Sequence, residues 1–327
     1  LGLPPEEPAT LSVVSGDASF RCYYRLSLPG DMHFIAVHAP PEKEDNPAFI
    51  AVQQRMMAAN LRVPGMLGWD LERGFLLQED FGDQLLLPCL DSIDAADRYY
   101  REAFTCLLNM QSMPLADGDL PDYDRARLLE EMALFPHWFV EQLLGHSLSD
   151  AEWQMLARLF DRLAARAEAQ PQGFVHRDFH SRNIMLLNDG ELGLIDFQDA
   201  VRGPLTYDVM SLLRDCYVHW PPASVKTWLL AYRQQLVAAG IAVPDEDAFL
   251  WDADWMGLQR HIKVLGIFAR LKLRDGKSAY LDDLPLVMAY TLSVAEQYED
   301  CREFVTWFSD TLLPLARRQS WFREVIL

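Results

Sequence analysis

The period of the hydrophobic pattern changes once along the chain, near residue 90. Before that point apolar and polar residues alternate, as in 20–26, which is typical of half-buried strands. After it, apolar residues recur at helical spacing, as in 94–113. The sequence therefore predicts a small β-rich part followed by a large, mostly helical part. The expected strands lie within 11–40 and at 74–78. The expected helices lie at 47–59, 94–113 and 124–144, from Ser149 onward, and from 207 to the end. Ser149 and Glu152 match a capping box at the start of the fourth of these helices.

A short β segment interrupts the helical part between residues 174 and 196. Two apolar runs, 185–187 and 192–195, flank Asn188-Asp189-Gly190, whose Asp-Gly step is a strong hairpin signal. A hairpin reverses the chain, so we expect Asp196 to return beside the loop that precedes the first run.

That loop reads His176-Arg177-Asp178-Phe179-His180-Ser181-Arg182-Asn183, an H-R-D-x-x-x-x-N pattern. Phosphoryl transfer needs one carboxylate to orient and deprotonate the attacking hydroxyl, and hard oxygen ligands for Mg²⁺ on the nucleotide phosphates. Asp178 suits the first task, and Asn183 with Asp196 suits the second. The spacing therefore predicts a phosphotransferase with Asp178 as catalytic base and with Asn183 and Asp196 as magnesium ligands.

These segments resemble the protein-kinase-like fold and, within it, the aminoglycoside/choline phosphotransferase family. A narrower resemblance is to the bacterial anomeric sugar kinases of cell-wall recycling, which phosphorylate N-acetylmuramate and N-acetylglucosamine. The segments that carry it are 15–21, 176–183, 195–204 and 259–270.

The resemblance implies an α+β fold with two lobes, a small antiparallel β-rich N-lobe and a large, mostly helical C-lobe. Residues 1–83 would form the nucleotide-binding lobe, and residues 84–327 would carry the catalytic loop and the acceptor pocket. The implied ligands are ATP and Mg²⁺. The residues that the resemblance places at the nucleotide are Ser15, Gly16, Asp17, Ala18, Ser19, Phe20 and Arg21 in a turn over the phosphates, and Gln78, Glu79, Asp80 and Phe81 at the crossing between lobes.

The third strand departs from the kinase pattern. Where that pattern has a lysine to hold the nucleotide phosphates, this chain has His38. A neutral histidine is a weaker partner for phosphate, so Arg21 and Lys43 are both candidates for the missing cation.

The acceptor is expected to be a small molecule. Only 208 − 196 = 12 residues separate Asp196 from Asp208, and no A-P-E anchor is present, so the chain lacks a peptide-docking activation segment. A muramate-type sugar carries a lactyl carboxylate, which favours a cation such as Arg202, Arg214, Lys263 or Arg270. Asp199, Arg202 and Arg214 are the candidate substrate contacts.

Two alternatives stay open. An aminoglycoside or amino-alcohol phosphotransferase would use the same catalytic loop but would need acidic groups for a cationic acceptor. A non-catalytic nucleotide-binding protein of kinase fold is favoured by His38, whereas the intact set of Asp178, Asn183 and Asp196 argues against it.

Other polar residues near the loop have structural interpretations. His176 and His180 are expected to pack within the loop, and Asp208 to cap a helix or anchor the loop. Arg214 and Asp215 lie on the next expected helix, where they form either a salt bridge with each other or substrate contacts.

The charge balance limits the partners. With 29 basic and 48 acidic residues the formal net charge is −19, a surface that repels nucleic-acid phosphates and anionic membranes. The five cysteines include no C-x-x-C pair, which favours reduced thiols. There is neither a leader-like N-terminal segment nor an apolar run of about 20 residues. We expect a cytoplasmic monomer that binds a small-molecule sugar and neither nucleic acid nor membrane.

Overall fold

Residues 9–15 and 20–325 are described by the computed structural model, and they form two compact units. Unit 1 is Leu1–Leu86 with Arg182–Asp199, and unit 2 is Leu87–Ser181 with Ala200–Leu327. The hairpin segment that follows the catalytic loop therefore clusters with the N-terminal residues rather than with its neighbours in sequence.

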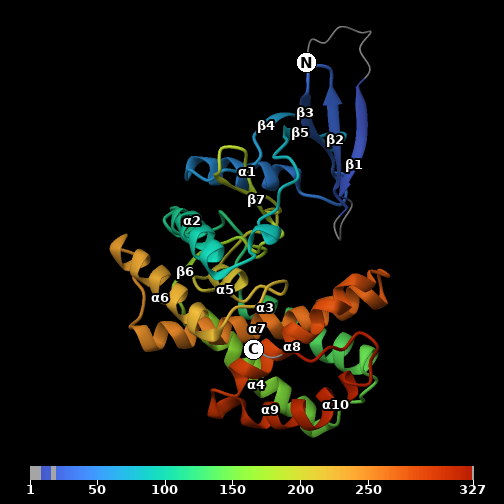
Figure 1. Cartoon of the computed structure of the whole chain (residues 1–327), viewed down its shortest axis with the longest axis vertical. Helices are drawn as coiled ribbons and strands as arrows, with labels where there is room; N and C mark the ends of the chain where they lie inside the picture. The colour runs from blue at the N-terminus through green and yellow to red at the C-terminus, as the bar shows by residue number, and fades with distance from the viewer. Residues whose placement is uncertain (1–8, 16–19, 326–327) are drawn as a thin grey trace. The chain divides into compact units, whose positions relative to one another are not determined.

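Unit 1 is built on a five-stranded antiparallel sheet with the strand order β1-β2-β3-β5-β4 (Figure 1). β2 and β3 pair along their full length, from Cys22 opposite His38 to Leu28 opposite Met32. The expected strands are confirmed, but the sequence analysis missed β4. The strands are β1 (Thr10–Ser15), β2 (Cys22–Leu28), β3 (Met32–His38), β4 (Met66–Asp70) and β5 (Phe75–Glu79).

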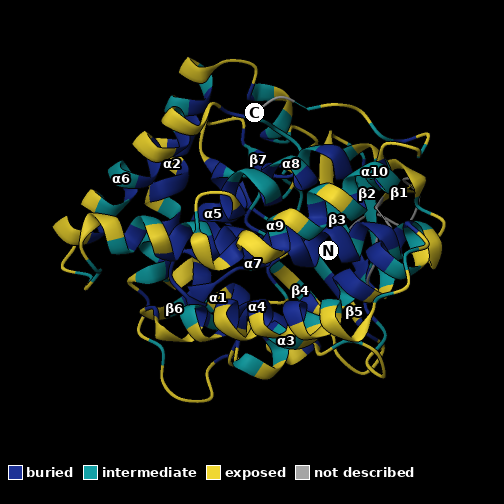
Figure 2. Cartoon of the chain, turned by 90° about the horizontal axis from the view of Figure 1, so that it is seen from below, coloured by how far each residue is buried: buried dark blue, intermediate teal, exposed yellow. Residues whose placement is uncertain are grey.

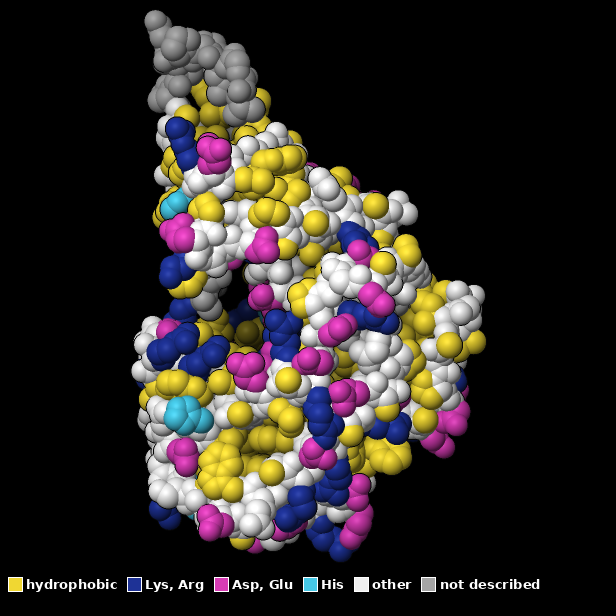
Figure 3. Space-filling model, turned by 180° about the vertical axis from the view of Figure 1, so that it is seen from behind, with side chains coloured by type: hydrophobic (Ala, Val, Ile, Leu, Met, Phe, Trp, Pro, Cys, Tyr) yellow, Lys and Arg dark blue, Asp and Glu magenta, His cyan; other side chains and the backbone are white. Residues whose placement is uncertain are grey.

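β5 shows the alternation expected of a sheet with two different faces. Leu76 and Gln78 are each 3% exposed, whereas Phe75, on the other face of the strand, is half exposed. Figure 3 shows hydrophobic side chains at the surface of this part of the chain. The expected helix is α1 (Asn46–Ala58), which begins where Asp45 accepts a hydrogen bond from the Ala48 amide.

The predicted hairpin is confirmed as β7 (Ile184–Leu186) and β8 (Leu192–Leu194). Its turn places Gly190 at φ +87°, a conformation that favours glycine. Bridges from Arg62 to Gly193 and from Leu85 to Met185 join the hairpin to the rest of unit 1. A side chain at Gly193 would meet the Phe81 ring at 2.7 Å, so the hairpin needs glycine at this close approach.

Unit 2 is mostly helical, as the pattern predicts, with buried residues along its helices and exposed residues on their outer faces (Figure 2). The capping box at Ser149 and Glu152 is present at the start of α4. The expected helix over 124–144 is instead two elements, because α3 ends at Met132 and a π-helix with Pro136 in its first turn follows. The elements of unit 2 are η1 (Leu87–Cys89), α2 (Ile93–Gln111), α3 (Arg125–Met132), η2 (Phe135–Leu143), α4 (Asp150–Ala169), β6 (Gln172–Val175), β9 (Val201–Pro204), α5 (Tyr207–Leu213), α6 (Pro222–Ala238), α7 (Glu246–Leu273), η3 (Ser278–Asp283), α8 (Leu284–Ala295), η4 (Glu299–Cys301), α9 (Arg302–Trp307), η5 (Phe308–Leu312) and α10 (Leu313–Ala316).

α7 is the central helix of unit 2. Every residue from Trp255 to Gly266 is buried, including polar side chains such as Lys263. A helix buried on all sides is surrounded by other elements, and its polar groups must find partners there. At Gly266 the backbone of residues 134 and 135 approaches so closely that a Cβ atom would lie 2.4 Å from it. This contact fixes the position of α7 against η2.

None of the described helices is long and apolar enough to cross a membrane.

Candidate active site

The catalytic loop starts where β6 ends, and a buried carboxylate holds its beginning. The backbone amides of His176 and Arg177 donate to the two carboxylate oxygens of Asp208, at 2.7 and 3.0 Å. Burial raises the pKa of Asp208 to about 7, although these hydrogen bonds oppose the rise. The expectation that Asp208 anchors the loop is confirmed.

A second buried carboxylate holds the end of the loop. Both the amide and the hydroxyl of Ser181 donate to Asp215, at 2.9 and 2.5 Å. Of the two alternatives for Arg214 and Asp215, the salt bridge between them is not formed, because Arg214 instead forms an ion pair with Asp254 at 2.7 Å. The helix α5 ends at Leu213, so the two residues are not held on one helix as the pattern suggested.

Between these two anchors lies Asp178, with several cationic groups around it. Burial alone would raise the pKa of Asp178, but the charges of Lys263, His180, Arg177 and His176 outweigh it and hold the pKa below its usual range. The Asp178 carboxylate is therefore ionised at neutral pH and can accept a proton.

Two of the cations that lower the pKa of Asp178, Arg177 and Lys263, belong to a buried network centred on Glu131. Glu131 forms ion pairs with Arg177 and with Lys263, the latter at 3.1 Å, and accepts a hydrogen bond from the Tyr123 hydroxyl. Lys263 also donates to the Tyr207 hydroxyl at 3.0 Å. The sequence analysis missed Glu131, since it is 46 residues from Arg177 and no local pattern marks it.

The predicted metal ligands lie together in unit 1. Asn183 directly precedes β7, and Asp196 lies two residues after the end of β8. The Asn183 amide group donates to Asp196 at 3.1 Å. The backbone amide of Ile195 donates to the Asn183 carbonyl at 3.1 Å, which keeps the two ends of the hairpin in register. The expectation that the hairpin returns Asp196 to Asn183 is confirmed.

Two residues of the candidate site have left-handed backbone conformations. Arg177 has φ +74° and Asp196 has φ +65°, although neither is glycine. Such conformations cost free energy and persist where the surroundings enforce them, often at functional sites. At Asp196 the side chain is further fixed by Gln198, whose amide donates to the other carboxylate oxygen at 2.6 Å.

The residues present fit Mg²⁺ that is carried by a nucleotide. Asn183 and Asp196 are hydrogen-bonded to each other, and each side chain carries a hard oxygen atom. Mg²⁺ characteristically takes one or two such protein ligands together with phosphate oxygens and water. Within the described residues there is no cluster of three or more His, Cys, Asp or Glu side chains that could hold a metal ion by themselves.

The expected phosphate-binding turn lies largely outside the described residues, since Gly16, Asp17, Ala18 and Ser19 are not among them. Arg21, just after the turn, is 2% exposed and forms an ion pair with Glu44 at 3.3 Å. Its guanidinium lies 4.5 Å from the centre of the Phe49 ring.

The Phe49 ring connects Arg21 to the metal-ligand segment. Phe49 stacks on Phe197 with ring centres 5.0 Å apart, and Phe197 directly follows Asp196. The other candidate cation, Lys43, lies over the Phe20 ring at 5.2 Å, and His38, which stands where the kinase pattern has lysine, stacks on Phe75 at 5.0 Å. Arg21 is therefore the candidate most closely tied to Asp196.

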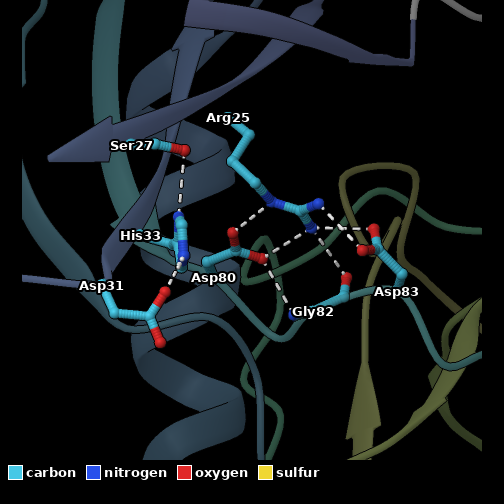
Figure 4. A network of polar contacts seen from close by, with 7 residues as sticks. All are labelled: Arg25, Ser27, Asp31, His33, Asp80, Gly82 and Asp83. Atoms are coloured by element: carbon cyan, nitrogen blue, oxygen red, sulfur yellow. Dashed lines mark hydrogen bonds and ion pairs between the residues drawn. The ribbon is translucent and has the colours of Figure 1, made fainter. Parts of the chain in front are cut away.

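The crossing segment is fixed by ion pairs to the sheet. Arg25 on β2 binds the carboxylates of Asp80 and Asp83 and the carbonyl of Gly82 (Figure 4). Asp80 in turn accepts a hydrogen bond from the Gly82 amide at 2.8 Å. The Asp80 side chain thus shapes the crossing, which leaves backbone groups as the part of Asp80 available to a base.

The other predicted crossing residues also have partners in unit 1. Gln78 is buried, Glu79 pairs with Arg62 at 3.2 Å, and the Arg62 guanidinium lies 5.4 Å from the centre of the Phe81 ring. These contacts position the backbone at the end of β5.

The candidate substrate contacts are spread over both units. Asp199 is exposed at the end of unit 1. Arg202 in unit 2 pairs with the fully exposed Asp117 at 3.0 Å, and Arg214 is paired with Asp254.

The phosphotransferase enzyme family matches this chain over residues 10–249, which is well over half its length. The chain belongs to this family. It is 45% identical over 290 residues to the N-acetylmuramate/N-acetylglucosamine kinase of Pseudomonas putida, covering 87% of this chain and 84% of that protein. It is 37% identical to the protein of the same name from Neisseria meningitidis, covering 90% of this chain and 89% of that protein.

Solved structures show the same fold at low sequence identity. An ethanolamine kinase of Plasmodium vivax superposes with a TM-score of 0.64 at 10% identity, covering 86% of this chain and 82% of that one. A choline kinase of Streptococcus pneumoniae superposes with a TM-score of 0.59 at 13% identity, covering 86% and 94%. This phosphotransferase thus has the protein-kinase-like fold that the sequence resemblance implied.

Proposed function

We propose that this phosphotransferase transfers the γ-phosphoryl group of ATP to the anomeric hydroxyl of an N-acetyl amino sugar, N-acetylmuramate or N-acetylglucosamine. The observation that carries the proposal is the hydrogen-bonded pair of Asn183 and Asp196 that follows, in the same chain segment, the ionised carboxylate of Asp178. The sugar is inferred from the names of relatives that match most of the chain.

Each of the three residues has one role in the proposal. Asp178 orients the sugar O1 hydroxyl and accepts its proton as O1 attacks the γ-phosphorus. The bond from that phosphorus to the β–γ bridging oxygen breaks, and ADP leaves with the electron pair. Asn183 and Asp196 hold Mg²⁺, which when bound neutralises charge on the phosphates.

The nucleotide is assigned to residues 1–83 and the acceptor to residues 84–327. The turn at 15–19 covers the phosphates, and the backbone of residues 78–81 contacts adenine. We infer that Arg21 supplies the phosphate-binding cation, because its ring partner Phe49 stacks on Phe197 next to Asp196. The enzyme acts as a monomer on a small-molecule sugar.

The test is to identify the product. With MgATP and N-acetylmuramate, we expect a ³¹P NMR spectrum that contains ADP and a sugar 1-phosphate whose phosphorus couples to the anomeric proton. A panel with N-acetylglucosamine, choline and kanamycin separates the alternatives. Phosphorylation of choline or kanamycin without either sugar would overturn the proposal.

The role of Asp178 has its own test. Asp178→Asn keeps the shape of the side chain but cannot accept the proton, so we expect kcat to fall about 10²- to 10⁴-fold with little change in KM for ATP. Steady-state kinetics measure both constants. A variant that turns over at nearly the wild-type rate would refute Asp178 as the base.

A further inference from the structure

The sequence analysis named four cations of unit 2 that could neutralise the carboxylate of an acidic sugar, namely Arg202, Arg214, Lys263 and Arg270. The first three already have carboxylate partners. The ion pairs are Arg202 with Asp117 at 3.0 Å, Arg214 with Asp254 at 2.7 Å, and Lys263 with Glu131 at 3.1 Å. A ligand carboxylate at any of these three would have to share the cation with the carboxylate that already neutralises it.

Arg270 is different from these three. Among the residues that the structure describes, no carboxylate is in ion-pair contact with Arg270, and its buried Nε has no hydrogen-bond partner. Burial and the nearby Arg274 together lower the pKa of Arg270, whereas Asp275 and Glu131 only partly oppose this. A buried N–H donor without a partner is costly, so an anion placed here would be strongly stabilised.

Arg270 lies on the face of α7 that carries Lys263. The two residues are seven positions apart, which is two helical turns and about 10.5 Å along the axis. Lys263 contributes to the pKa of Asp178, and Glu131, which contacts Lys263, contributes to that of Arg270. Arg270 is thus close enough to the network around the catalytic base to be linked to it electrostatically.

Aromatic contacts also connect the catalytic loop to this part of α7. The His180 ring packs edge-on against Tyr217 at 5.6 Å, and Tyr217 stacks on Phe268 at 6.4 Å. Phe268 is two residues before Arg270. The loop that carries Asp178 and the helix that carries Arg270 therefore belong to one packed region of unit 2.

We propose that Arg270 binds the lactyl carboxylate of N-acetylmuramate and thereby determines how well the enzyme uses that sugar relative to N-acetylglucosamine, which lacks the carboxylate. A guanidinium matches a carboxylate with two parallel hydrogen bonds, and such a contact replaces the partner that Arg270 lacks. The inference rests on the function proposed above and adds the residue that reads the substrate's charge.

The experiment compares kcat/KM for the two sugars in Arg270→Gln. Losing one charge-assisted contact lowers kcat/KM for N-acetylmuramate about 10- to 100-fold, mainly through KM. The value for N-acetylglucosamine falls far less. Arg274→Gln is the matched control, because Arg274 is one turn further along, is exposed and is paired with Asp275 at 2.7 Å, and it should not change the ratio between the sugars.

A second measurement uses the substrate instead of the protein. The methyl ester of N-acetylmuramate keeps the size of the lactyl group but removes its charge. For the wild-type enzyme, kcat/KM should be lower for the ester than for the acid, by the same factor by which Arg270→Gln lowers kcat/KM for the acid. For Arg270→Gln, kcat/KM should be the same for the ester and the acid. This comparison on the wild-type enzyme decides the question even if Arg270→Gln folds poorly.

The outcomes are separable. Equal loss on both sugars, no loss on either, or a wild-type enzyme that treats ester and acid alike would overturn the role of Arg270 while leaving the sugar kinase intact. If wild-type enzyme phosphorylates neither sugar, the proposed function fails and the inference fails with it.

Discussion

Asp178 illustrates how a buried carboxylate can remain ionised. Burial favours the neutral acid, and only the surrounding cations reverse the balance, with Lys263 the largest of them. The protein thus keeps Asp178 ionised through three neighbours in the loop and through Lys263, which is remote in sequence. At this scale the H-R-D-x-x-x-x-N pattern singled out Asp178 as the candidate base, but it could not reveal Lys263 as the cation that lowers the pKa of Asp178 most.

Replacing Lys263 tests this electrostatic role. Lys263→Met removes the largest opposing charge, so the pKa of Asp178 rises and a larger fraction of the base is protonated at a given pH. We expect the acidic limb of the kcat profile to move to higher pH, whereas Lys263→Arg keeps it in place. Lys272→Met is the control, because Lys272 is on the same helix but donates only to Ser278.

The pH profiles decide between electrostatic and merely structural roles. A uniform loss of kcat at every pH, without movement of the acidic limb, would contradict the role assigned to Lys263. The pKa of Asp178 is also lowered by His176, Arg177 and His180. These three residues are unchanged in all three variants, so their effects on the pKa cancel in the comparison.

At the scale of elements, the catalytic loop depends on two buried carboxylates that follow β9 in the chain. Asp208 holds the start of the loop and Asp215 holds its end, each through hydrogen bonds from loop donors. The sequence predicted the first anchor because Asp208 opens a helix. It did not predict the second, since α5 stops short of Asp215.

The raised pKa of Asp208 predicts a dependence of stability on pH. An unfolded Asp has a pKa near ~3.9, so with a folded value of about 7 the folded protein binds an extra proton between these values. This contribution to stability is complete below about pH 4 and is lost as the pH rises through 7. Asp208→Asn cannot titrate, so its unfolding midpoint should fall less than that of the wild type between pH 5 and pH 8.

The control for Asp208 is another aspartate that asparagine can replace. Asp245 caps α7 through the Ala248 amide, and Asn caps helices as well as Asp does. Asp245→Asn should retain the wild-type slope of the midpoint with pH. Parallel slopes for wild type and Asp208→Asn would contradict the assignment.

The packing of α7 against η2 gives a prediction for Gly266, which lies between Lys263 and Arg270 in sequence. Alanine would favour the helix by about 1 kcal/mol, but its Cβ would lie 2.4 Å from backbone that cannot move independently. The clash dominates, and we expect Gly266→Ala to lower the free energy of unfolding by about 1–3 kcal/mol in urea titrations. Gly68→Ala, at an open position, should change it little.

A neutral or stabilising effect of Gly266→Ala would show that α7 and η2 do not approach as closely as described. Because Arg270 is one turn beyond Gly266, the same variant should also weaken use of N-acetylmuramate if α7 shifts.

At the scale of the whole molecule, the sequence predicted the order of β-rich and helical parts because each has its own hydrophobic period. It failed where a local pattern is weak. β4 has no clear alternation, since Leu67 and Trp69 are exposed and Gly68 lies between them. The helix predicted over 124–144 is split because periodicity continues across the change to a π-helix.

The candidate site likewise has one part that the sequence predicted and one part that it did not. The pair of Asn183 and Asp196 was predictable because a hairpin with a strong turn signal joins them. The Glu131 network was not, because its members come from α3, the catalytic loop and α7, and only tertiary packing brings them together. Sequence patterns can identify chemistry within one segment, but the electrostatic setting of that chemistry depends on contacts between distant segments.

Binding of MgATP tests the metal pair through the stability of the whole chain. A ligand that binds only the folded protein raises its stability by about 2.7 kcal/mol when present at 100 times its Kd. We expect MgATP to raise the unfolding midpoint of the wild type, and Asp196→Ala to lose most of that rise because one of two oxygen ligands is gone. Asp189→Asn, in the exposed turn of the same hairpin, should keep the rise. A full MgATP-dependent rise in Asp196→Ala would mean that the nucleotide's metal is held elsewhere, and the assignment of Asn183 would then fall as well, since the two side chains are hydrogen-bonded partners.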